Sequence, residues 1–181
     1  AARDNAEFIL RELFQDGRLL RSWKDGDSRI PGFLEDYAGF GNALLTLYET
    51  TLEPRWMEEA EGLSRLVLDL FWDEKEGIFY DSPRDGERLV VRAREIMDNA
   101  TPSGNSLAVE FLIRMAFLGG RQDLRRVAEG VLAREIDGAA KFPSAFGRFL
   151  SALTLCWGPP TEVVILGDVG DPEFRDLLAT A

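Results

Sequence analysis

The sequence predicts a mainly α-helical protein in which outer and inner helices alternate along the chain. Apolar residues recur with the helical period over most of the 181 residues. Some of the expected helices are apolar on nearly their whole circumference, whereas others have one apolar stripe and one charged face. Each nearly all-apolar helix follows a proline and a small residue, at Pro31-Gly32, Pro102-Ser103 and Pro143-Ser144. Together these observations indicate a weak internal repeat of helical hairpins.

The first hairpin is expected from two helices and the segment that joins them. A helix over about Asp4 to Phe14 has its apolar residues on one side. A glycine-rich stretch with one short strand, LLRSW, follows it. The next helix, from about Leu34 to Thr51, is apolar on much of its circumference, and this pattern predicts that it is buried.

The second hairpin is longer because it contains an inserted β-hairpin. An amphipathic helix is expected from Pro54, a favoured first-turn residue, to about Trp72. The strand-like runs GIFYD and RLVVR stand on either side of SPRDGE, whose Asp-Gly pair predicts a tight turn between two strands. A second apolar helix then runs from about Pro102 to Leu118, and a Gly-Gly pair ends it.

The third hairpin and the chain end complete the pattern. An amphipathic helix is expected from Gln122 to about Glu135, and an apolar helix from about Pro143 to Cys156. TEVVILGD then predicts a short C-terminal strand, and PEFRDLLAT predicts a last short helix. Three such hairpins make about half of an (α/α)6 toroid, a ring of six helical hairpins with an inner and an outer layer. An ordinary helical bundle is the alternative.

Composition excludes several classes of function. The net charge of −11 disfavours nucleic acid and anionic membranes as partners. The absence of histidine excludes histidine-based triads and histidine metal sites, and we expect neither a metal nor a cofactor. The single Cys156 excludes an internal disulfide. No signal peptide is visible, which predicts a cytoplasmic location, although a start at Ala1 without methionine indicates a fragment of a longer protein.

Four stretches carry a resemblance to a known family. They are PGFLEDYAGFGNALLTLYETT, RWMEEAEGL, FWDEKEGIFYD and EIMDNATPSGNSLAVEFLIRM, in this order, and a late VVILGD run fits as well. The chain resembles the C-terminal part of the spermatogenesis-associated, thioredoxin-domain-containing family. The resemblance implies a thioredoxin-like domain followed by an (α/α)6 toroid, similar to those of six-hairpin glycosidases and N-acylglucosamine epimerases. Residues 1–181 then form a single domain, the C-terminal part of the toroid, without the thioredoxin-like domain and the first half of the ring.

The toroid geometry predicts where a functional site lies. Inner helices of such a ring are roughly parallel, so their N-termini, with free N–H groups and positive dipole ends, gather at one mouth. Glycoside hydrolysis needs two carboxyl groups across a cleft, one with a raised pKa as the acid, and we expect Asp36 and Asp98 in these catalytic roles. The residues expected to bind substrate are Glu35, Tyr37, Arg92, Glu95, Asn99, Ser103 and Asn105.

Two functions remain open at this point. One is a carbohydrate-active domain, a sugar hydrolase or isomerase that acts on a sugar-like small molecule. The other is a non-catalytic module that binds a ligand or scaffolds a thioredoxin-domain-containing protein. The same polar residues also suit helix capping, with Thr101 or Asn99 as the cap residue. Because half a ring leaves apolar inner surface uncovered, we expect association with another chain or with the missing half of the toroid.

Overall fold

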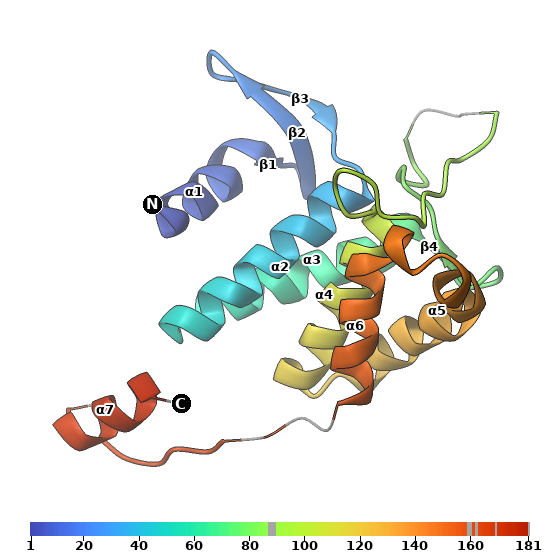
Figure 1. Ribbon diagram of the computed structural model, residues 1–181. Helices are drawn as coiled ribbons and strands as arrows, with labels where there is room; N and C mark the ends of the chain where they lie inside the picture. Colours follow the sequence, from blue (N-terminus) through green and yellow to red (C-terminus); the bar gives the residue numbers. More distant parts are fainter. Residues whose placement is uncertain (87–89, 159–160, 162, 169, 181) are drawn as a thin grey trace.

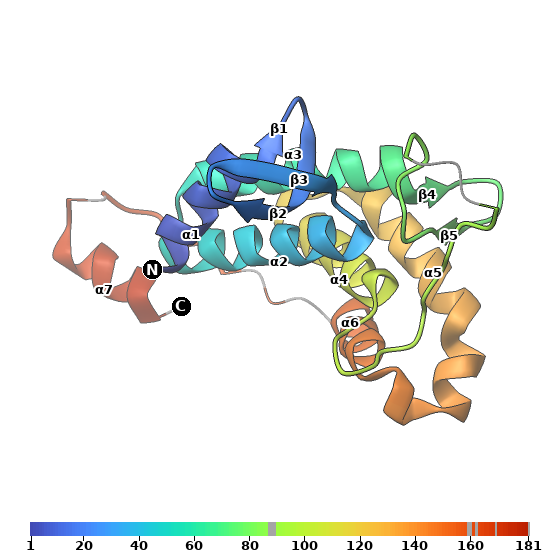
Figure 2. The same cartoon turned by 90° about the horizontal axis from the view of Figure 1, so that it is seen from above.

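Two layers of helices make up the body of the chain in the computed structural model, which describes residues 1–86, 90–158, 161, 163–168 and 170–180. The helices α2, α4 and α6 form one layer, and α3 and α5 pack behind it (Figures 1 and 2). Within the described residues the α-helices are α1 (Ala2–Phe8), α2 (Leu34–Thr51), α3 (Pro54–Phe71), α4 (Gly104–Gly119), α5 (Gln122–Lys141), α6 (Gly147–Trp157) and α7 (Pro172–Thr180). The predicted alternation of helix layers is therefore confirmed.

The front layer is held together by a close crossing of α2 and α4. Gly41 of α2 lies against the ring of Phe111 in α4, and a Cβ atom there would stand 2.5 Å from the ring. The absence of a side chain at Gly41 thus lets the two helices approach. Residues from every side of α4 are buried, which explains its nearly continuous apolar sequence.

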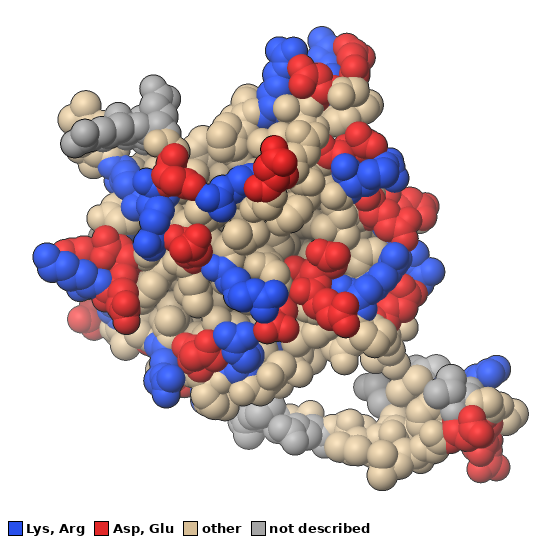
Figure 3. Space-filling view, turned by 180° about the vertical axis from the view of Figure 1, so that it is seen from behind, with Lys and Arg blue, Asp and Glu red and all other residues tan. Residues whose placement is uncertain are grey.

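The back layer shows the amphipathic pattern that the sequence predicts. In α3 the residues at helical spacing that face the core are Trp56, Ala60, Leu63, Val67 and Leu70. Its acidic residues Glu58 and Glu59 are exposed. Seen from behind, the molecule carries interspersed acidic and basic side chains (Figure 3). Among the described residues, none of the helices has both the length and the hydrophobicity needed to cross a lipid bilayer.

A three-stranded antiparallel sheet precedes α2, where the sequence predicts only one strand. Its strands are β1 (Phe14–Gln15), β2 (Arg18–Lys24) and β3 (Asp27–Pro31), joined in the order β1-β2-β3. Both connections are two-residue Asp-Gly turns, 16–17 and 25–26, in which all four residues have positive φ. Asp-Gly is the pair that such hairpin turns favour, so these two pairs are the signal in the sequence for this sheet.

The inserted hairpin is present, but its strands differ from those predicted. The strand β5 (Ile78–Phe79) pairs with β4 (Trp72–Asp73), which directly continues α3, and not with the RLVVR run. Gly77, with positive φ, donates its amide hydrogen to the carbonyl of Asp73 and closes the turn. Residues 88–89 of the RLVVR run lie outside the described residues, and 90–92 form no strand.

Three further boundaries differ from the sequence prediction. The first helix gives way after Phe8 to a π-helical turn, η1 (Ile9–Leu13), and α6 is preceded by a 3-10 turn, η2 (Pro143–Ala145). Helix α5 continues to Lys141, past the predicted end at Glu135. The C-terminal strand is not found in the described part of residues 161–168, of which residue 162 lies outside the description. The predicted last helix is confirmed as α7, which stands apart from the body (Figures 1 and 2).

Candidate binding site at the mouth of the front layer

The N-termini of α2, α4 and α6 lie close together, as the sequence predicts. Gly104, the first residue of α4, lies so close to α2 that a Cβ atom there would stand 3.2 Å from the backbone nitrogen of Glu35. Between α4 and α6, the Asp98 carboxylate bonds to backbone amides at the start of both helices. The NATPSGNS segment thus connects two helix entrances at this mouth.

The α4–α6 side of the mouth is a capping corner, made up of Asp98, Ser103, Ser106, Ala145 and Arg148. Asp98 accepts hydrogen bonds from the amides of Ser103 (2.9 Å) and Arg148 (2.7 Å), one at each carboxylate oxygen. Its own amide donates to the carbonyl of Ala145 at 2.7 Å. Ser103 is the N-cap of α4, and its hydroxyl oxygen accepts from the amide of Ser106 at 3.1 Å. The cap is therefore Ser103, not Thr101 or Asn99, and the polar groups of this corner satisfy one another.

The α2–α4 side of the mouth holds a cavity of about 340 Å³, which we call the mouth cavity. It lies between the starts of the two helices and the segments around residues 81 and 93–102. Its charged and polar lining residues, together with one aromatic ring, are Arg21, Phe33, Glu35, Asp81, Glu95, Asn99, Thr101 and Ser103. Here polar side chains face open space instead of one another alone.

Arg21 and Glu35 form an ion pair at one wall of the mouth cavity. The Arg21 guanidinium also lies 5.1 Å from the centre of the Phe33 ring, a cation–π contact. The hydrogen bond to Glu35 raises the pKa of Arg21. This wall therefore combines a fixed positive charge, a carboxylate and an aromatic face.

Asp81 supplies the half-buried carboxyl group of the cavity. Burial raises the pKa of Asp81, and the carboxylates of Glu95 and Glu35 raise it further, against a 2.9 Å hydrogen bond from the Glu95 amide. The backbone fixes this residue, because its carbonyl accepts from Leu34 at 2.9 Å and its amide donates to Ala93 at 2.9 Å. Asp81 thus combines a fixed position with a shift toward the protonated form.

The two residues predicted to be catalytic serve helix starts in this structure. Asp36 accepts a hydrogen bond from the Phe33 amide at 2.8 Å, the reciprocal bond of a capping arrangement at the start of α2. Burial raises the pKa of Asp36, while Arg21 lies 3.6 Å away. Asp98 belongs to the capping corner, where backbone amides occupy both of its oxygens. Neither residue lines the mouth cavity, and their catalytic role stays a prediction.

The residues predicted to bind substrate divide into two groups. Those that line the mouth cavity are Glu35, Glu95, Asn99 and Ser103. Tyr37 lies instead in the core, where its hydroxyl accepts from the Leu19 amide at 2.8 Å and docks β2 on α2. Asn105 is buried, and its amide nitrogen donates to the Glu95 carbonyl at 2.9 Å, which supports the cavity wall from behind. Arg92 lines a different groove, between α3 and the segment after β5.

Sequence reasoning missed Arg21 and Asp81. Arg21 lies inside the expected LLRSW strand, and Asp81 ends the GIFYD run, so both were assigned to β structure alone. They reach the mouth because β2 and the segment after β5 fold back onto the start of α2. Within the described part of the chain, no cluster of three His, Cys, Asp or Glu side chains is placed to hold a metal ion.

Comparison with known proteins gives relatives over nearly the whole chain. No family model matches the sequence. Spermatogenesis-associated protein 20 of Rattus norvegicus is 32% identical over 189 residues, covering 98% of this chain and 24% of that protein. The Homo sapiens protein of the same name is 32% identical over 178 residues, covering 92% of this chain and 23% of that protein. The chain thus spans about a quarter of the length of these curated relatives.

Comparison with solved structures identifies the fold. The chain superposes with a TM-score of 0.61 on a variant of an unsaturated glucuronyl hydrolase (UGL) with dGlcA-Glc-Rha-Glc. The match covers 99% of this chain and 53% of that chain, at 17% sequence identity. The helices described above therefore match about half of an α/α toroid, in agreement with the sequence prediction.

Proposed function

We propose that the mouth cavity binds a saccharide-like small molecule. Two findings support this proposal. The chain belongs with spermatogenesis-associated protein 20 by homology over nearly its whole length, and it has the fold of part of a toroid glycosidase. A hydroxyl-rich ligand needs several hydrogen-bonding groups beside an aromatic face. The cavity supplies them through the Arg21–Glu35 pair, the Asn99 amide and the Phe33 ring. One observation supports the proposal most, namely that fixed, half-buried Asp81 faces this cavity with a raised carboxyl pKa.

The same carboxyl groups suit acid–base chemistry on a sugar. Hydrolysis of a glycosidic bond needs one carboxyl group that gives up a proton and one that stays charged, and isomerisation of a sugar needs one group that accepts a proton and one that donates it. In this proposal Asp81 is the proton donor, since burial and two nearby carboxylates favour its protonated form. Glu35 is the charged partner, because Arg21 pairs with it. The proposed reaction class is a sugar hydrolase or isomerase.

A non-catalytic ligand-binding or scaffolding module is the second candidate, and one observation favours it. Asp36 and Asp98, the carboxylates that stand in the first turn of α2 and just before α4, are both engaged in helix capping. Carboxylates that are engaged in helix capping are not free for acid–base catalysis, so a mouth of this kind suits ligand binding without turnover. The two candidates share the mouth cavity and differ only in whether product forms.

Calorimetric titration of the chain with saccharides tests the proposal. The titrants are glucose, N-acetylglucosamine and the tetrasaccharide dGlcA-Glc-Rha-Glc, and product formation is followed in parallel. We expect saturable binding that Asp81→Asn and Glu35→Gln weaken about tenfold or more. The control is Asp137→Asn, at an exposed position of α5. Binding with product supports the enzyme, binding without product supports the module, and no saturable binding of any titrant contradicts both.

We also propose that the open side of the front layer is covered by further helices of a toroid. The chain exposes 10978 Å² of surface, whereas roughly 8800 Å² is typical of a folded monomer of this mass. The helix α7, which stands apart from the body, adds to this exposed surface. A second cavity, of about 660 Å³, lies on this side between α1, α2 and α4, with Phe40, Leu47 and Leu107 among its apolar lining.

The molar mass in solution tests this second proposal. We expect multi-angle light scattering to show self-association of the isolated chain, or a stable complex once the remaining part of a longer relative is added. A strictly monomeric species of 20.3 kDa that neither self-associates nor binds the added part would contradict the proposed cover.

A further inference from the structure

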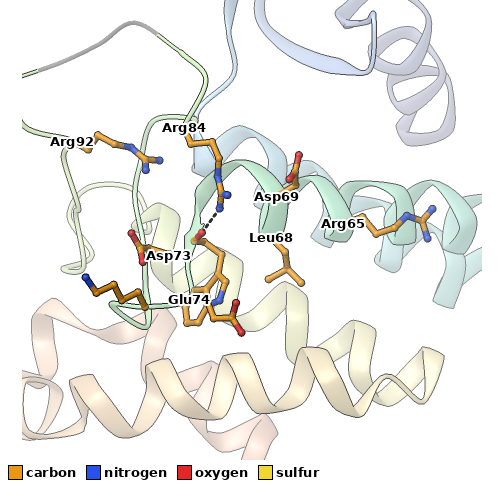
Figure 4. Close-up of a pocket in the computed structure, with 9 residues that line it drawn as sticks. Arg65, Leu68, Asp69, Asp73, Glu74, Arg84 and Arg92 are labelled. Atoms are coloured by element: carbon orange, nitrogen blue, oxygen red, sulfur yellow. Dashed lines mark hydrogen bonds between the residues drawn. The ribbon is translucent and has the colours of Figure 1, made fainter.

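A further concave site lies apart from the mouth cavity and is independent of the function proposed above. This outer groove, of about 1010 Å³, is bounded by the C-terminal half of α3, by β4 and by the segment after β5 (Figure 4). It shares no lining residue with the mouth cavity. Leu68 and Trp72 give it apolar surface. Its positive charges come from Arg65, Lys75, Arg84 and Arg92, and its carboxylates from Asp69, Asp73 and Glu74.

Arg92 is partly buried in the outer groove without a carboxylate partner. Its guanidinium donates to the carbonyl oxygens of Ser82 and Leu70, the latter at 3.4 Å, and lies 4.2 Å from the centre of the Tyr80 ring. No carboxylate of the described residues lies within 4.0 Å, and the buried Nε has no hydrogen-bond acceptor there. Burial lowers the pKa of Arg92 and nearby Arg84 lowers it further, whereas Tyr80 and the Asp73 carboxylate raise it, and an arginine remains charged at neutral pH.

Arg84 adds a second guanidinium group with free donors. It donates to the carbonyl oxygen of Trp72, and no carboxylate of the described residues pairs with it. Both guanidinium groups point into the groove from the segment after β5 (Figure 4). A guanidinium has five donor hydrogens, so these two side chains keep several donors for a ligand.

The rest of the chain makes this arrangement unusual. With 32 acidic and 21 basic residues, carboxylates outnumber cations, and most of the other described arginines pair with a carboxylate. Arg94 pairs with Glu135, and Arg148 pairs with Glu110. Two neighbouring arginines that face one groove without such partners repel each other and are partly desolvated, a cost that a bound anion removes.

We propose that Arg84 and Arg92 bind the oxyanion group of a small organic ligand, a phosphorylated or acidic sugar, in the outer groove. Guanidinium groups bind phosphate and carboxylate through paired, charge-assisted hydrogen bonds. Trp72 lines the groove and offers an aromatic surface to the ring of the ligand. The carboxylates of Asp69 and Glu74 also line the groove (Figure 4) and are placed to accept from the hydroxyl groups of the ligand. A ligand with one anionic group on a hydroxyl-bearing ring fits these charges better than a polyanion does.

Nuclear magnetic resonance of the arginine side chains tests this proposal directly. The ¹⁵N-labelled chain is titrated with inorganic phosphate, glucose 6-phosphate, glucuronate and, as the neutral control, glucose. We expect the Nε–H resonances of Arg84 and Arg92 to shift and saturate with the anions and to stay in place with glucose. The phosphate and glucuronate titrations identify which oxyanion the groove prefers, and saturation by either one supports the site.

Two variants separate a built site from general attraction of anions. Arg84→Gln is the test variant, because this residue is exposed and its loss leaves the Arg92 contacts in place. We expect it to weaken binding about tenfold, the effect of losing one charge-assisted contact. Arg126→Gln, at an exposed arginine of α5 outside the outer groove, is the matched control and is expected to leave binding unchanged. Equal weakening by both variants, or no saturable shift up to about 10 mM anion, overturns the proposal.

Discussion

The capping corner and the mouth cavity lie next to each other at the same mouth and use their polar groups differently. In the corner, both oxygens of Asp98 accept backbone amides, and Ser103 caps α4. In the cavity, Glu35, Asp81 and Glu95 face open space beside Arg21. The corner therefore stabilises the fold, and the cavity is where hydrogen-bonding capacity remains for a ligand.

Because of this difference, the polar residues of one segment can have two roles, helix capping and ligand contact. The NATPSGNS stretch has many hydrogen-bonding side chains, and part of that density serves helix starts. Only the residues whose side chains reach the cavity, such as Asn99, remain candidates for ligand contact. Polar density in a sequence thus indicates a helix entrance first, and a site only where the structure leaves groups open.

The largest expected effect is the loss of the Asp98 carboxylate. Asp98→Ala leaves amides at the starts of α4 and α6 without their acceptor, and each such bond is worth about 1 to 2 kcal/mol. We expect the free energy of unfolding in urea to fall by about 2 to 4 kcal/mol. Asp137→Ala, at an exposed position of α5, is the control and should stay within about 0.5 kcal/mol. Equal effects of the two variants would contradict the role of the corner.

The second effect concerns the crossing of α2 and α4, the helices whose starts border the capping corner and the mouth cavity. A methyl group at Gly41 would overlap the Phe111 ring, so Gly41→Ala should lower the free energy of unfolding by about 1 to 3 kcal/mol. Gly39 lies in the same helix with nothing within 4 Å of a built Cβ atom. Gly39→Ala should therefore stabilise the chain by about 0.5 to 1 kcal/mol, because alanine favours the helix. Thermal unfolding of the two variants compares them, and the same sign for both would refute the crossing.

The third effect is a small change in the free energy of unfolding, which distinguishes the mouth cavity from the capping corner. Glu35→Gln removes an ion pair whose two side chains are 40% and 38% exposed. Such pairs contribute little, so we expect the free energy of unfolding to change by less than about 1 kcal/mol. A loss as large as that of Asp98→Ala would show that the cavity wall, like the corner, is built for stability.

The smallest effect is a dependence on pH that comes from Asp81. Its pKa is raised in the folded chain, so folding favours its protonated form, and this contribution is lost as pH rises through the folded pKa. Asp81→Asn removes the cost of ionisation and keeps an acceptor for the Glu95 amide. Urea titrations from pH 3 to pH 7 should therefore show the variant gaining stability relative to the parent as pH increases. A relative loss with increasing pH would contradict the raised pKa.

The sequence predicted the helical framework because burial periodicity is a local signal. Helix α2 has the predicted bounds, Leu34–Thr51, and α3 begins at the predicted Pro54. The convergence of helix starts at one mouth also followed, since it depends only on the alternation of layers. Four of the seven residues predicted to bind substrate, Glu35, Glu95, Asn99 and Ser103, line the cavity for this reason.

The remaining features depend on contacts between distant parts of the chain. Nothing near GIFYD indicates that Asp81 would bond to the start of α2, 47 residues earlier in the chain. The RLVVR run has strand-like residues, but β5 finds a nearer partner in β4. Asp36 and Asp98 are residues of the type that a catalytic carboxyl pair uses. Only their hydrogen bonds to backbone amides show that they serve the helix starts.

Saccharide affinity of two matched variants tests the central claim, that the open carboxylates and not the capping carboxylates contact the ligand. Asp81→Asn and Asp36→Asn each replace a carboxylate by an amide that still accepts the backbone hydrogen bond seen here. Calorimetric titration with the same saccharides should show about a tenfold or greater loss of affinity for Asp81→Asn. Asp36→Asn should bind as the parent does. Unchanged binding by Asp81→Asn together with a loss in Asp36→Asn would contradict the account.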